Sequence, residues 1–183
     1  KDLDVEVYFR GPGEEDNQNA QVTLIRSALE NGYHGIVLAP SHPGMLSDQL
    51  QKVRDKGLKT VIIDSAQEGS DYGSFIATDN YMAGRMAAEE MKRLMGDQGQ
   101  VLLFRFVENS ASTVRREQGF IDGLRDSDIQ IVGEAFAGTT LGSAFRNALA
   151  LLEKHPQAQG IFTPAESSTQ GLARALRSLQ MKG

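Results

Sequence analysis

The sequence contains no cysteine, and this absence excludes several kinds of chemistry. Without a thiol among its 183 residues, it has no disulfides, no thiolate zinc sites and no cysteine nucleophile. The absence does not assign a cellular compartment. A membrane-spanning helix needs an uninterrupted apolar run of about 18 residues, and the sequence has no such run. It therefore offers no candidate transmembrane segment.

An excess of positive charge is also missing. Lysine and arginine number 19 against 24 aspartate and glutamate residues, which gives a net charge of −5. Surfaces that bind nucleic acid are basic, so we expect no nucleic-acid partner through this stretch. Proline is scarce, with five residues against 19 glycines, which suits a fold with many short turns. A composition that is 40% hydrophobic and 23% charged is that of an ordinary globular protein.

What the sequence does contain is a regular alternation of apolar runs and helical patterns. The apolar runs predict strands at 3–9, 35–39, 58–64, 74–78, 100–106, 129–136 and 159–163. Helical periodicity is clear at 17–30 and at 80–95, and the second helix has Asp79 as its predicted N-cap and stops at Gly96. Successive strands lie roughly 30 residues apart, the length of a β-α-β unit. The pattern predicts an α/β fold with parallel sheets.

The first three predicted strands differ in character. Those at 35–39 and 58–64 are nearly all apolar, which is typical of strands covered on both faces. The run at 3–9 alternates between apolar and polar residues instead, like an edge strand with one face in water. A doubly wound sheet rarely begins at its edge, so we expect a further strand and helix ahead of this run.

The chain also divides near Asp79. The segment 65–78 contains no helical pattern, and a new series of strand–helix units follows it. We therefore expect two doubly wound lobes, an N-terminal lobe over 1–79 and part of a C-terminal lobe over 80–183.

The helix predicted at 112–125, with Ser112 as its N-cap, raises a question of charge. Its first turn carries partial positive charge, which disfavours cations, yet two arginines lie there. Arg116 precedes Phe120 by four residues and so lies on the apolar stripe, whereas Arg115 lies toward the polar side. The turn follows a strand end, which in an open α/β sheet borders the ligand crevice. Arg116 therefore either forms a structural ion pair or donates hydrogen bonds to a ligand.

Polar residues follow the other predicted strands at the same edge of the sheets. They supply hydroxyl, carboxylate and guanidinium groups, which together suit a hydroxyl-rich ligand. The candidate ligand-binding residues are Arg10, Ser41, Asp64, Ser65, Arg105, Arg116, Thr139 and Glu166.

We expect neither a cofactor nor catalysis. The segment GPGEED places Asp16 where a dinucleotide-binding loop has its third glycine, and no histidines cluster to hold a metal. Glu108 and Glu166 are conceivable as a carboxylate pair for glycoside cleavage, but lining a binding cleft is the simpler role for both.

Four segments follow one another along the chain: TVIIDS (60–65), FIATDNYMAGRMAAEEM (75–91), RREQGF (115–120) and GIFTPAESSTQGLARAL (160–176). In order and spacing they resemble the ribose-binding branch of the type I periplasmic binding proteins, the sugar receptors of ABC transporters. That family is related to the ligand cores of lactose-repressor-type regulators. The resemblance covers essentially all of the chain.

The resemblance implies two Rossmann-like lobes joined by a three-stranded hinge, with a sugar held between them and no reaction. It also implies a monomer in the periplasm, or otherwise outside the cytoplasm, with the membrane permease of an ABC transporter as its partner. Relative to that family, this stretch lacks the first strand–helix unit and a large C-terminal part.

The resemblance also implies the roles of particular residues. The aspartate that takes sugar hydroxyls in the family falls on Asp64, and the sugar-binding arginine at a helix start falls on Arg116. Three further positions differ from the family: Ser65 stands where arginine is frequent, and Ala39 and Ala165 stand where asparagine is found. We therefore expect a pentose, hexose or furanose-like ligand other than ribose.

Three alternatives stay open at this point. One is the effector-binding core of a lactose-repressor-type transcription regulator, which carries an upstream helix-turn-helix. Another is the ligand sensor of a membrane histidine kinase, which continues into a transmembrane segment. The third is an enzyme of the flavodoxin-like type.

Overall fold

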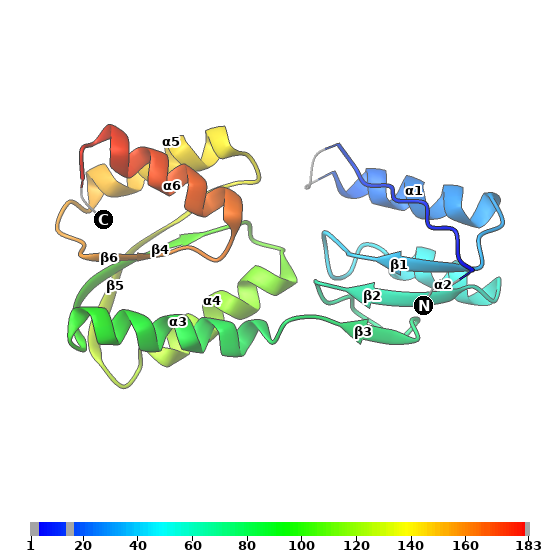
Figure 1. Ribbon diagram of the computed structural model, residues 1–183, viewed down its shortest axis with the longest axis horizontal. Helices are drawn as coiled ribbons and strands as arrows, with labels where there is room; N and C mark the ends of the chain where they lie inside the picture. Colours follow the sequence, from blue (N-terminus) through cyan, green and yellow to red (C-terminus); the bar gives the residue numbers. More distant parts are fainter. Residues whose placement is uncertain (1–3, 14–16, 182–183) are drawn as a thin grey trace.

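The structure is a computed structural model, and it describes residues 4–13 and 17–181. Its strands form two separate three-stranded parallel sheets, with the orders β1-β2-β3 and β5-β4-β6. Figure 1 shows each sheet with its own helices, as two lobes side by side along the long axis of the molecule. The predicted α/β class with two Rossmann-like lobes is confirmed.

The N-terminal lobe has its core on one face of its sheet. Its elements are α1 (Gln18–Glu30), β1 (Gly35–Leu38), α2 (Ser47–Asp55), β2 (Lys59–Ile63) and β3 (Ser74–Ile76). Alternate strand residues, such as Leu38 and Ile62, point toward α1 and α2 and meet Ile25, Leu50 and Val53 there. Burial of these side chains is what fixes the helices on the sheet.

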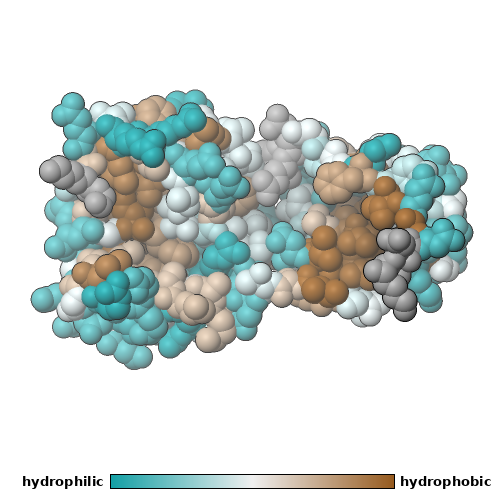
Figure 2. All heavy atoms as spheres, in the orientation of Figure 1, coloured by the Kyte–Doolittle hydropathy of each residue, from teal (hydrophilic) through white to brown (hydrophobic). Residues whose placement is uncertain are grey.

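The opposite face of this sheet is open, contrary to the expectation of strands covered on both faces. Val37 is 68% exposed and Phe75 is 45% exposed. Both helices of the lobe contribute to the single buried cluster on the other face. Figure 2 shows hydrophobic residues gathered at the surface of this lobe.

The strand predicted at 3–9 is wrong for residues 4–9, and Leu3 lies outside the described residues. Residues 4–9 have no strand conformation, and their apolar side chains lie in solvent, with Val7 at 81% and Phe9 at 88% exposure. A strand exists only through pairing with a neighbour, and this run pairs with none of the described strands. An alternating pattern alone does not hold a segment in a sheet.

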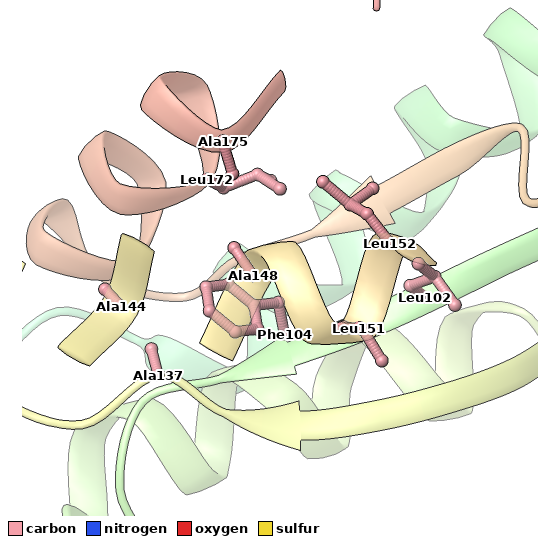
Figure 3. Close-up of a cluster of buried hydrophobic side chains, with 9 residues drawn as sticks. All are labelled: Leu102, Phe104, Ala137, Ala144, Ala148, Leu151, Leu152, Leu172 and Ala175. Carbon is pink, nitrogen blue, oxygen red and sulfur yellow. The ribbon is translucent and has the colours of Figure 1, made fainter. Parts of the chain in front are cut away.

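The C-terminal lobe is wound on both faces of its sheet. Its elements are α3 (Asn80–Met95), β4 (Gln98–Arg105), α4 (Ala111–Gly123), β5 (Asp128–Phe136), α5 (Leu141–Lys154), β6 (Gly160–Phe162) and α6 (Glu166–Ser178). In Figure 1, α3 and α4 lie below the sheet and α5 and α6 lie above it. The central strand β4 serves both layers. Val101 and Leu103 pack toward α3 and α4, whereas Leu102 and Phe104 pack toward α5 and α6 (Figure 3).

Helices α3 and α4 lie in unusually close contact because glycines face each other's backbones. A Cβ atom added at Gly84 would lie 2.7 Å from the backbone nitrogen of Phe120 and would overlap the carbonyl oxygen of Arg116. A Cβ at Gly119 would overlap the carbonyl oxygen of Tyr81 in the same way. This close approach fixes the position of the α4 backbone that carries Arg116.

The ends of the predicted helices are mostly where the sequence places them. Asp79 caps α3 by accepting a hydrogen bond from the backbone N–H of Met82 (3.0 Å), and Gly96 ends it in the left-handed conformation, with φ of 68°. The N-cap of α4, however, is Ser110 rather than Ser112. The hydroxyl of Ser112 instead accepts a hydrogen bond from a side chain of the other lobe.

Six of the seven predicted strands are present as β1 to β6, within one or two residues at most of their ends. In the described chain the backbone passes once between the two sheets, through residues 77–79. The domain boundary at residue 79 stays a prediction, and we propose it on the basis of this crossing.

Candidate functional site

A cleft with a volume of about 970 Å³ lies between the two lobes. The N-terminal lobe contributes the segments that follow β1 and β2, and the C-terminal lobe contributes those that follow β4, β5 and β6. The first turns of α4 and α6 also reach it. The carboxyl ends of parallel strands border the ligand crevice in open α/β sheets, so the cleft lies where the topology predicts a binding site.

The structure brings most of the sequence-predicted residues together in this cleft. Six of the eight line it: Ser41, Asp64, Ser65, Arg116, Thr139 and Glu166. Arg10 and Arg105 lie outside the lining. Arg10 is exposed, and its guanidinium donates to the carbonyl oxygen of its neighbour Phe9 (2.9 Å).

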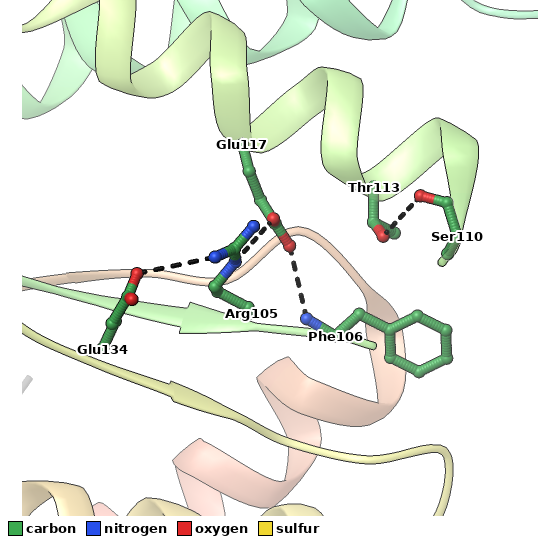
Figure 4. A network of polar contacts seen from close by, with 6 residues as sticks. All are labelled: Arg105, Phe106, Ser110, Thr113, Glu117 and Glu134. Carbon is green, nitrogen blue, oxygen red and sulfur yellow. Dashed lines mark hydrogen bonds and ion pairs between the residues drawn. The ribbon is translucent and has the colours of Figure 1, made fainter. Parts of the chain in front are cut away.

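Arg105 is held in a polar network inside the C-terminal lobe (Figure 4). Its Nε donates to Oε2 of Glu117 at 2.9 Å, and its Nη1 lies 3.6 Å from Oε2 of Glu134. The guanidinium also lies 4.9 Å from the centroid of the Phe136 ring. We therefore assign Arg105 to the packing of β4 against α4 and β5.

Glu117 is the buried partner in that network. Its side chain is 1% exposed, and its Oε1 accepts a hydrogen bond from the backbone N–H of Phe106 (3.4 Å). Burial raises the pKa of Glu117, while the ion pair with Arg105 opposes the rise. Glu117 was not among the residues predicted to be functional, although its position three residues before the buried Phe120 places it on the inner face of the helix.

Arg116 lines the cleft without a carboxylate partner. Its Nη2 donates to Oδ1 of Asn80 at 2.6 Å, and its Nη1 donates to the carbonyl oxygen of Pro164. Both acceptors are neutral, and no ion pair of Arg116 is found among the described residues. The structural ion pair considered for this residue is therefore not what holds it. The guanidinium has more N–H donors than these two acceptors use.

Asp64 enters the cleft with an unusual backbone. Its φ is 66°, the left-handed conformation that a non-glycine residue adopts at a cost. The backbone N–H of Asp64 donates to the carbonyl oxygen of Ile76 (3.0 Å), which ties the end of β2 to β3. Within the described chain the carboxylate has no hydrogen-bond or ion-pair partner. It lines the cleft as a free acceptor.

A hydrogen bond spans the cleft beside Asp64. The Ser65 hydroxyl, in a residue only 7% exposed, donates to the hydroxyl of Ser112 at 3.0 Å. Ser65 belongs to the N-terminal lobe and Ser112 to the first turn of α4 in the other lobe. The two lobes therefore touch through side chains on the wall of the cleft, as well as through the backbone at 77–79.

Neighbouring amides orient two of the remaining polar residues. The backbone N–H and the hydroxyl of Ser41 both donate to Oε1 of Gln21, at 3.0 and 3.1 Å. Glu166 is the first residue of α6, where the helix dipole favours a carboxylate, and its Oε1 accepts from Nε2 of Gln170 (2.8 Å). Gln21 and Gln170 also line the cleft. Nothing in the sequence pattern distinguished them.

The described part of the chain has neither a metal cluster nor a membrane-spanning helix beside the cleft. Across residues 4–13 and 17–181, no group of three or more histidine, aspartate or glutamate side chains is placed to hold a metal ion. None of the helices in this part of the chain is long and apolar enough to cross a membrane.

The sequence has relatives among characterised proteins. Residues 1–183 match the sequence model of the periplasmic binding protein domain. The chain is 22% identical over 164 residues to the ribose import binding protein of Bacillus subtilis, covering 90% of this chain and 53% of that protein. It is 21% identical over 184 residues to the D-ribose/D-allose-binding protein of Pseudomonas aeruginosa, covering 97% and 58%. The chain thus spans about half the length of the curated relatives that it matches.

Solved structures resemble it more closely. The periplasmic component of an ABC-type sugar transport system from Hahella chejuensis is 32% identical, with a TM-score of 0.86 over 90% of this chain and 61% of the other. An ABC transporter solute-binding protein from Agrobacterium vitis, with bound D-fucose, is 30% identical, with a TM-score of 0.90 over 96% and 62%.

Proposed function

The chain belongs to the periplasmic binding protein domain family, and we propose that its cleft binds a sugar or sugar-like polyol without catalysing a reaction. The observation that carries the proposal is that Asp64 of one lobe and Arg116 of the other line the same cleft. One offers a carboxylate acceptor and the other a guanidinium donor. A sugar presents both hydroxyl donors and oxygen acceptors, so it can engage the two together.

The polar groups of the cleft form different hydrogen bonds with the ligand in this proposal. Asp64 accepts hydrogen bonds from sugar hydroxyls, and Arg116 donates to a hydroxyl or ring oxygen. Glu166 and Ser41 lie on the same lining and add an acceptor and a hydroxyl. Hydrogen bonds to charged groups contribute about 1.5–3 kcal/mol each. No proton transfer or nucleophile is needed for this role.

Binding is coupled to movement of the lobes in this proposal. The lobes are joined through residues 77–79, and a ligand that contacts both of them favours the closed arrangement. Such a ligand shifts the population only because its affinity is higher for the closed state. The closed protein with its ligand then presents a surface that a membrane permease can recognise.

The setting of the protein is proposed from its relatives. The Bacillus subtilis relative is named as an import protein, and the Hahella chejuensis structure as a periplasmic transport component. We infer that the full protein is a monomeric solute-binding component of an ABC sugar transporter, located outside the cytoplasm. Because Ser65, Ala39 and Ala165 differ from the ribose-binding pattern, the ligand in this proposal is a sugar other than ribose.

Calorimetric titration of the full-length protein with D-fucose, D-allose, xylitol and D-ribose tests the proposal. These are ligands named for similar proteins. We expect at least one of the first three to bind with a 1:1 stoichiometry and more tightly than D-ribose. The proposal fails if none of the four binds.

Substitution of Arg116 tests which group holds the ligand. Arg116→Ala removes at least one charge-assisted hydrogen bond, worth about 1.5–3 kcal/mol, and about 1.4 kcal/mol corresponds to a factor of ten. We therefore expect the dissociation constant to rise at least about tenfold. Arg10→Ala is the matched control, because Arg10 is exposed and outside the cleft. Equal affinity of the two variants would remove Arg116 from the site.

A further inference from the structure

Asn80 links three parts of the structure that the binding proposal treats separately. It is the first residue of α3 and is 9% exposed. Its Oδ1 accepts the hydrogen bond from Nη2 of Arg116 at 2.6 Å, and its Nδ2 donates to the carbonyl oxygen of Thr78 at 3.1 Å. Thr78 lies in the segment through which the chain passes between the lobes. Asn80 itself does not line the cleft.

We propose that Asn80 is a positioning residue that holds the Arg116 guanidinium at the cleft and ties it to the interlobe crossing. This inference rests on the proposed function, because it concerns how the same cleft is prepared for its ligand. An unrestrained arginine side chain has many rotamers, and fixing them on binding costs affinity. Asn80 and the carbonyl oxygen of Pro164 hold two nitrogens of the Arg116 guanidinium. The side chain is therefore already ordered before the ligand binds.

The chemistry of an amide suits this role. Its oxygen accepts from the guanidinium while its nitrogen donates to a carbonyl, so one side chain serves both contacts. The amide oxygen of Asn80 is neutral, so it holds the Arg116 guanidinium without neutralising the positive charge. That charge stays available to a sugar oxygen. An aspartate would form an ion pair with Arg116 and could not donate to Thr78.

The same contacts link ligand binding to movement of the lobes. Any change in the backbone at 77–79 moves the Thr78 carbonyl relative to Asn80. The Asn80 side chain then shifts, and the guanidinium of Arg116 that is bonded to it shifts as well. By thermodynamic reciprocity, a ligand that fixes Arg116 favours one arrangement of the crossing. Asn80 thereby couples the occupancy of the cleft to the angle between the lobes.

The first test is a double-substitution cycle in the full-length protein. The ligand is whichever sugar of the four-compound panel binds the unsubstituted protein most tightly. We expect Asn80→Ala to weaken binding at least fivefold, and to have no further effect when Arg116→Ala is already present, because Asn80 acts through Arg116. Additive losses would overturn the inference.

Asn147→Ala is the matched control for this cycle. Asn147 lies in α5, and its Nδ2 donates to the carbonyl oxygens of Phe136 (2.9 Å) and Ala137 (3.3 Å) at the end of β5, so its substitution also removes amide-to-carbonyl bonds. Asn147 does not line the cleft, and its helix α5 packs on the opposite face of the sheet from α3, which begins at the crossing. Equal affinities of Asn80→Ala and Asn147→Ala would likewise overturn the inference.

The second test needs no ligand. Cysteine is absent from these 183 residues. With any cysteine outside this stretch replaced by serine, Arg26→Cys in α1 and Glu153→Cys in α5, both at exposed positions, give one spin-label pair across the lobes. We expect Asn80→Ala to broaden the interlobe distance distribution, Arg116→Ala to broaden it similarly, and Asn147→Ala to leave it unchanged. An unchanged distribution in Asn80→Ala refutes the coupling.

The two tests separate the inference from the proposed function. If no sugar of the panel binds, the proposed function fails, and the distance distributions alone decide whether Asn80 couples Arg116 to the crossing. If Asn80→Ala does not fold, Asn80→Ser replaces it in both tests. Serine suits the start of a helix but is too short to reach both partners.

Discussion

Gly84 in α3 offers the sharpest test of how α3 and α4 pack. Replacing it by alanine adds a methyl group 2.7 Å from the backbone nitrogen of Phe120 and into the carbonyl oxygen of Arg116. Both obstacles are backbone atoms, so no side-chain rotation can relieve them. The two helices must move apart, and this shift of the α4 backbone must loosen the packing of Phe120 against Phe162.

The size of the effect follows from opposing contributions. Overpacking a close-packed interface costs about 1–3 kcal/mol, and we expect the upper part of this range because the obstacle is backbone. Alanine has a higher helix propensity than glycine, and this difference stabilises the folded protein by about 0.5–1 kcal/mol. The net loss of unfolding free energy is then about 2 kcal/mol. At about 2–4 °C per kcal/mol for 150–250 residues, the melting temperature falls by about 4–8 °C.

Urea unfolding of the full-length protein, followed by circular dichroism, measures this change. Gly142→Ala in α5 is the matched control, because its position is exposed and the nearest atom to a new Cβ is the flexible end of Arg146, 3.6 Å away. There the helical preference of alanine acts alone, and stability rises by up to about 1 kcal/mol. The two substitutions should therefore have opposite signs. If Gly84→Ala is as stable as Gly142→Ala, the described contact between α3 and α4 is wrong.

Two further predictions concern Glu117 and Ser65. Because burial raises the pKa of Glu117 above its ordinary value of 4.5, the folded state holds the proton more tightly, and its stability should fall as pH rises from about 4.5 through the raised pKa. Glu117→Gln cannot titrate, so urea unfolding between pH 4 and 8 should show this decline only in the unsubstituted protein, and parallel curves would contradict it. Ser65→Ala removes the hydrogen bond to Ser112, worth about 0.5–1.5 kcal/mol, so the ligand-free protein should open and its radius of gyration by X-ray scattering should rise. An unchanged radius would exclude the bond as a contact that holds the lobes.

Periodicity made most of the fold predictable. The helix in α3 shows its cap, its apolar stripe and its terminal glycine within its own residues, so Asp79 and Gly96 were assigned correctly. The position of Arg116 at the cleft followed from its spacing of four residues to Phe120, because that spacing fixes the face of the helix.

The failures share a physical cause, which is dependence on a partner distant in the sequence. The run at 4–9 has an alternating pattern, but a strand needs a neighbour, and no local pattern supplies one. Arg105 lies at a strand end like the cleft residues, yet its direction is decided by Glu117, on the helix that follows. Asn80 gave no signal, because its importance lies in a contact with Arg116, 36 residues further on.

The position of β4 determines how the C-terminal lobe comes apart. Residues 101–104 are essentially inaccessible, and successive side chains belong to opposite cores. Neither pair of helices keeps its packing against the sheet if this strand leaves, so the two cores lose their structure together rather than one after the other. The lobe is a single cooperative unit in this sense. Amide protons in the middle of β4 exchange with solvent only when the whole lobe opens, whereas exchange at the crossing between the lobes reports the smaller motions that accompany binding.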